Sequence, residues 1–121
     1  MDSYRSLEAW KRAHAALLLT LPALDQAYHP RSKSLFDQIR RAVISIEANI
    51  VEGYALNTQP LFRRHLRIAM GSAAEAECLL RVAAELGYLT GAVVTSIEGK
   101  LAGAMAATRG LLRSTPVTGA V

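Results

Sequence analysis

Residues 33–54, KSLFDQIRRAVISIEANIVEGY, hold the hydrophobic pattern that decides the fold. Apolar side chains recur there at steps of three and four residues and so line one face of a helix. This face consists of Leu35, Ile39, Val43, Ile46 and Ile50, and further apolar side chains lie beside it at Phe36, Ile44 and Val51. The segment therefore predicts a long amphipathic helix, and Gly53 and Asn57 suit its exit turn.

A second long helix is predicted directly downstream, over residues 58–86. Thr58 suits the N-cap, and Pro60 falls in the first turn, where its missing N–H does no harm. Gly87 is suited to a left-handed stop. The middle of the segment, residues 69–76 (AMGSAAEA), is rich in small side chains, which let neighbouring helices approach closely.

The charges of these two segments predict an antiparallel hairpin. If the chain folds back near residues 55–58, positions whose numbers sum to about 114 become neighbours, as in an up-down bundle. Glu47 then faces the region of Arg67, and opposite signs also meet elsewhere along the pair. We therefore interpret the carboxylates as structural ion-pair partners rather than as catalytic acids. The acidic members are Glu47, Glu52, Glu75 and Glu77, and the basic members are Arg40, Arg41, Arg63 and Arg67.

Two more helices are predicted on either side of the hairpin. The first covers residues 6–27, and Pro22 is expected to kink it. Its apolar stripe is Leu7, Trp10, His14, Leu17, Leu21, Leu24 and Tyr28. The last covers residues 91–113, with Thr90 as its cap and a stripe of Val94, Ile97, Leu101, Ala104, Thr108 and Leu111. Three glycines weaken this last helix by about 1 kcal/mol each, so it needs packing partners.

Together these patterns predict one all-α domain over residues 1–121, an antiparallel up-down four-helix bundle with a disordered tail at 114–121. Helices one and two carry more apolar surface than one stripe each, and the surplus predicts burial in subunit contacts. The longest apolar run, residues 15–24, is too short to span a bilayer. A cytoplasmic protein is favoured over a secreted one, because the apolar spacing starts upstream of that run.

Composition argues against several classes of function. The chain has a net charge of +4 and a single cysteine, Cys78, so an intramolecular disulfide is excluded. The histidines show no metal-ligand spacing with it, and no nucleophile motif or phosphate loop is present. We therefore expect no cofactor, no metal and no enzymatic activity. His14 is interpreted as a hydrogen-bonded packing residue rather than a ligand, and Asn49 as a packing residue rather than a recognition residue.

The basic residues allow two interpretations. Arginine pairs well with phosphate, and it outnumbers lysine by 11 to 3. The candidates for nucleic-acid contact are Lys11, Arg12, Arg40, Arg41, Arg63, Arg64 and Arg67. In the alternative interpretation Arg63 and Arg67 are committed to internal ion pairs, which leaves Arg64 as the most available of the three in its cluster.

Four blocks of sequence resemble the 23S rRNA-intervening-sequence family of four-helix-bundle proteins. They are LEAWKRAH at residues 7–14, QIRRAVISIEANIVEG at 38–53, residues 62–77, and LGYL at 86–89, in the order of the family. The sequence departs from the family pattern at Glu47, where proline is usual, and in its sparsely charged last helix.

The resemblance implies a bundle similar in shape to the accessory protein of diversity-generating retroelements. That relative is a pentameric barrel that binds nucleic acid and associates with a reverse transcriptase. The resemblance therefore implies a ring-like homopentamer. Two functions follow as hypotheses: a non-enzymatic accessory protein that binds RNA or DNA, or a scaffold that binds another protein and no nucleic acid. Neither hypothesis involves a membrane.

Overall fold

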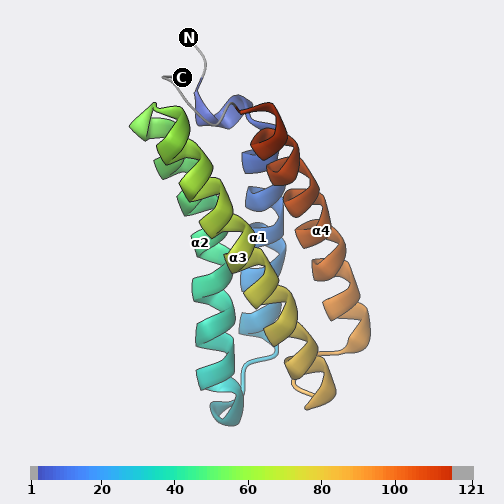
Figure 1. Ribbon diagram of the computed structural model, residues 1–121. Helices are drawn as coiled ribbons and strands as arrows, with labels where there is room; N and C mark the ends of the chain where they lie inside the picture. Colours follow the sequence, from blue (N-terminus) through green and yellow to red (C-terminus); the bar gives the residue numbers. More distant parts are fainter. Residues whose placement is uncertain (1–2, 116–121) are drawn as a thin grey trace.

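A computed structural model of the chain describes residues 3–115 and shows an antiparallel four-helix bundle (Figure 1). The elements are η1 (Tyr4–Ser6), α1 (Glu8–Gln26), η2 (Pro30–Ser32), α2 (Lys33–Leu56), α3 (Gln59–Glu85) and α4 (Gly91–Ser114). The helix bounds lie within two residues of the predicted ones. The predicted disorder of 114–121 falls almost wholly outside the described residues.

Each helix packs against its two neighbours, and the four together enclose the core. α2 contacts α1 and α3, and α4 contacts α3 and α1. Because neighbours run in opposite directions, η1, the starts of α1 and α3, and the ends of α2 and α4 gather at one end of the bundle (Figure 1). We call this the η1 end. None of the helices in the described residues is long and apolar enough to cross a membrane.

The face that α1 turns to the core differs from the predicted stripe. Its buried residues are Ala9, Ala13, Ala16, Thr20 and Leu24, and only Leu24 belongs to that stripe. The larger side chains Trp10, His14 and Leu17 are half-buried instead. Small residues at the core let α1 pack closely, while the larger ones cover its flank toward α2, where His14 meets Glu47.

The helices end and begin at the capping residues that the sequence predicts, but the prediction for Gly53 was wrong. Asn57 ends α2 with a φ of 60°, and Gly87 follows α3 with a φ of 75°. Thr90 Oγ1 accepts a hydrogen bond from the Val93 N–H at 3.2 Å and caps α4. Gly53, expected at the exit turn, instead lies inside α2 and is buried, because the side chain of His65 on α3 fills the space beside it. α1 continues through Pro22 to Gln26.

Candidate nucleic-acid interface

Polar side chains join α2 to α3 in the predicted register. His65 Nδ1 lies 2.9 Å from Asn49 Oδ1, and the hydroxyls of Ser45 and Ser72 lie 2.8 Å apart. Asn49 also donates to the carbonyl of Ser45 at 2.8 Å. Asn49 thus links the two helices and has the structural contacts of a packing residue.

The predicted ion pairs between α2 and α3 are wrong in their partners. The Glu47 carboxylate lies 3.1 Å from His14 Nδ1 of α1 and not beside Arg67. Arg40 binds Asp25 of α1 at 2.7 Å rather than an acid of α3. The reason is rotational: Arg40 and Glu47 are two turns apart on the side of α2 that faces α1, whereas Ser45 and Asn49 face α3.

The other predicted acidic partners also find different surroundings. Glu75 accepts a hydrogen bond from Gln38 Nε2 at 2.8 Å, and Glu52 lies 4.0 Å from His65 Nε2. Glu77 has no ion-pair partner among residues 3–115. The arginines at the start of α3 are therefore not neutralised by the glutamates that the charge pattern assigned to them.

Arg63 fastens the start of α3 to the end of α4. Its guanidinium is half-buried and donates hydrogen bonds to the carbonyls of Leu112 and Thr115, the latter at 2.9 Å. These carbonyls lie in the last turn of α4 and just beyond it, where a helix leaves acceptors unpaired. Arg63 is thus a structural residue, although a carboxylate is not its partner.

Four exposed arginines surround this anchor, two from each helix. Arg64 and Arg67 follow Arg63 on α3, and Arg109 and Arg113 lie on the last turns of α4. Within the described part of the chain, none of the four makes a hydrogen bond or an ion pair. We call these four residues the arginine patch.

Carboxylates are confined to the far half of the same two helices. Glu75, Glu77 and Glu85 of α3 and Glu98 of α4 lie toward the end opposite η1, where Arg81 binds Glu98 at 3.2 Å. The remaining helix surface near the patch is built from small or uncharged residues, including Gly71 and Ala106. On α3 and α4 the surface around the arginine patch therefore carries no carboxylate, and the nearby acid of α2 is Glu52, which lies 4.0 Å from His65.

Charge is distributed unevenly along the whole bundle. The η1-end half, residues 3–17, 45–71 and 103–115, has eight arginines and lysines and three glutamates. The other half, residues 18–44 and 72–102, has six basic and six acidic residues. The excess positive charge of the described chain thus lies entirely at the η1 end.

The remaining predicted contact residues lie on other surfaces. Lys11 and Arg12 flank a shallow pocket between α1 and α4, and Arg12 binds Glu8 at 3.1 Å. Arg40 and Arg41 lie near the opposite end of the bundle, and Arg41 donates to Gln38 at 2.7 Å. The structure therefore brings only Arg64 and Arg67 of the seven candidates into the arginine patch.

Sequence reasoning missed Arg109 and Arg113. They stand four residues apart at the end of the last helix, and an antiparallel bundle must place that end beside the start of α3. The spacing and the topology were both available from the sequence, so this pair was a detectable signal. Cys78, the single cysteine, is exposed. No cluster of three or more metal-ligating side chains occurs within residues 3–115.

Two comparisons with known proteins bear on the chain. The family model described as 23S rRNA-intervening sequence protein matches residues 5–108. This span includes most of η1, all of α1, α2 and α3, and most of α4. A search of curated proteins gave no match.

Proposed function

Since the chain belongs to the 23S rRNA-intervening sequence protein family, we propose that it is a non-enzymatic, homo-oligomeric member that binds the phosphate backbone of nucleic acid. The arginine patch is the observation that carries this proposal. Its four arginines are exposed and make no ion pair with a carboxylate of the described chain, so their guanidinium groups are available to phosphate oxygens.

The patch favours duplex over single-stranded ligands. Proteins that bind single strands stack the bases on aromatic side chains. In residues 59–71 and 103–115, which carry the patch, the aromatic ring of Phe62 is buried in the core. Contacts from arginine alone hold the backbone and carry little sequence information. We therefore propose structured RNA or duplex DNA as the ligand, bound with weak sequence preference.

A gel-shift titration at two salt concentrations tests the proposal. The test variant replaces Arg64, Arg67, Arg109 and Arg113 by alanine. A matched control removes the same charge by replacing Arg31, Lys33, Arg41 and Arg81, four exposed basic residues of the opposite half of the bundle. We expect the wild-type protein to bind duplex RNA more tightly at low salt, and the test variant to lose on the order of 10-fold to 1,000-fold in affinity.

The control variant should keep most of the wild-type affinity. No binding by the wild-type protein at low salt, or equal losses in the two variants, would exclude the arginine patch as the interface. The second candidate function, a protein-binding scaffold, is supported by the exposed apolar side chains Leu18, Ile44, Ile68 and Leu86. The scaffold function is favoured if the wild-type protein does not bind nucleic acid.

Assembly into a ring is part of the proposal. The likeness to the accessory protein of diversity-generating retroelements supports a pentamer, and five subunits of charge +4 would carry +20. Such a ring would present several arginine patches to one duplex. Light scattering tests this step, because a monomeric mass at the concentration of the binding assay would contradict it.

A further inference from the structure

α3 carries a second apolar row that the bundle does not bury. Leu61, Ile68 and Val82 follow one another at steps of seven residues, or twice seven, and their exposed fractions are 37%, 42% and 36%. Glu75 occupies the position of the repeat between Ile68 and Val82. Leu86, one helical turn beyond Val82, is 57% exposed. The core face of α3 is formed by other residues. A seven-residue repeat is the pattern by which one helix packs along another.

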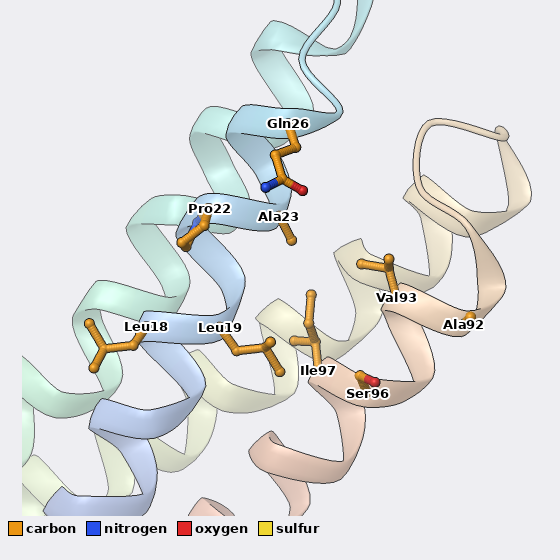
Figure 2. Close-up of a pocket in the computed structure, with 9 residues that line it drawn as sticks. All are labelled: Leu18, Leu19, Pro22, Ala23, Gln26, Ala92, Val93, Ser96 and Ile97. Carbon is orange, nitrogen blue, oxygen red and sulfur yellow. The ribbon is translucent and has the colours of Figure 1, made fainter.

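α1 has an outer row with the same spacing. Lys11, Ala15, Leu18 and Pro22 follow at steps of four, three and four residues, and Leu18 is 60% exposed. Figure 2 shows Leu18 and Pro22 on the side of α1 turned away from α4. Both residues also lie at the outer, α1 edge of a shallow apolar groove between α1 and α4.

The neighbouring surface of α4 allows a further helix to approach this row. α4 lines the groove with Ala92, Val93, Ser96 and Ile97, of which Ala92 and Ser96 are small and exposed. The exposed Gly99 continues this small surface toward the η1 end. Small residues let helix backbones come close together. A helix lying over α1 would therefore also contact α4.

The two outer rows are complementary at a constant offset of 64 residues. In this alignment Val82 of α3 meets Leu18 of α1. Glu75 meets Lys11, and its carboxylate also accepts a hydrogen bond from Gln38 of its own subunit. Further along the two rows, Leu86 meets Pro22. An acid thus opposes a base, and apolar side chains oppose apolar side chains. A single polar pair within an apolar row is a known means of fixing helix register.

We propose that α3 of one subunit docks in parallel along α1 and the α1–α4 groove of a second copy of this chain. Because α1 and α3 run in the same direction in the bundle, all copies then point the same way (Figure 1). The interface joins two different surfaces, so it is heterologous and propagates head to tail. This inference rests on the homo-oligomeric state proposed above, and it gathers every η1 end on one side of the assembly.

A charge-swap experiment on the full chain tests the interface by light scattering during size-exclusion chromatography. The variants are Lys11→Glu, Glu75→Lys and the double variant that carries both. Glu85→Lys is the matched control, because Glu85 is an exposed glutamate of α3 outside the row. Circular dichroism verifies that each variant remains helical.

We expect a wild-type mass that is a multiple of the 13.1 kDa subunit, a fall toward one subunit in each single variant, and recovery in the double variant. The control should keep the wild-type mass. A monomeric wild type would overturn the homo-oligomer and this interface together. An oligomeric wild type that single swaps leave intact, or a double variant that does not recover, would overturn this interface alone.

Discussion

Gly53 of α2 has no side chain, and His65 and Phe62 of α3 occupy the space beside it. A Cβ atom placed there would lie 2.7 Å from the Cβ of His65 and 3.2 Å from the Phe62 ring. Cβ contacts of 2.7 Å force the backbones to move. The glycine is therefore needed for close packing, which also brings His65 within hydrogen-bond distance of Asn49.

We expect Gly53→Ala to lower the free energy of unfolding by about 1–2 kcal/mol. Overpacking costs about 1–3 kcal/mol, and alanine recovers up to about 1 kcal/mol through its helix propensity. Gly71→Ala is the control, since no atom lies within 4 Å of its Cβ position. That change should stabilise the bundle by about 0.5–1 kcal/mol. Urea unfolding curves measure both, and equal effects of the same sign would contradict the packing argument.

At the scale of the helix, the two threonines at N-cap positions differ in whether their side chain makes a capping hydrogen bond. Thr90 accepts a hydrogen bond from the Val93 N–H at the start of α4, whereas Thr58 makes no side-chain capping bond at the start of α3. Thr90→Ala should therefore cost about 1 kcal/mol of stability. Thr58→Ala should cost only a few tenths, because no capping bond is lost. Thermal melts of the two variants compare them directly, and a larger loss from Thr58→Ala would contradict the assignment.

The first turn of α2 should respond to acid. Lys33 donates a hydrogen bond of 2.7 Å to Asp37, and this bond holds the pKa of the Asp37 carboxyl below its ordinary value. A lowered pKa means that the folded chain binds fewer protons than the unfolded chain. The stabilisation is therefore present above the ordinary pKa of aspartate and is lost as the pH falls through the lowered one.

The variant Asp37→Asn measures this contribution. Near neutral pH it should unfold at a lower urea concentration than the wild type, and the difference should shrink as the pH falls through the acid range. Both side chains of the pair are at the surface, so the effect should be small and should weaken with salt. A difference that is constant with pH would show that the carboxylate charge is not responsible.

The helices were predictable because their apolar residues repeat with the helical period, and the position of the turn at residues 55–58 gave the register of α2 against α3. The ion pairs were not predictable in this way. Sequence position sets the height of Glu47 along the bundle, but its partner depends on how α2 is rotated between α1 and α3. Likewise the core face of α1 consists of Ala9, Ala13 and Ala16, which a search for large apolar residues passes over.

At the scale of the whole molecule, the charge of the bundle is concentrated where the ligand is proposed to bind. The arginine patch became visible only when α3 and α4 were placed side by side, since its four members come from segments about 40 residues apart in the chain. If all copies point the same way, each assembly presents its patches together. Binding strength then depends on assembly as well as on charge.

The Glu75→Lys variant separates these two contributions. It raises the net charge of each subunit by two, so an account based on charge alone expects tighter binding to duplex RNA. The proposed interface predicts weaker binding to duplex RNA, because the variant dissociates the assembly and each subunit then binds through a single patch. We expect a loss of about 10-fold or more in apparent affinity and a shallower dependence on salt.

Glu85→Lys makes the same change of charge outside the interface. This control should bind duplex RNA at least as tightly as the wild type, with the oligomer intact. A filter-binding series for the two variants at several salt concentrations provides the comparison. If both variants bind more tightly than the wild type, affinity follows charge alone and assembly does not contribute to it. If only Glu75→Lys weakens binding, the arginine patches act together on one duplex.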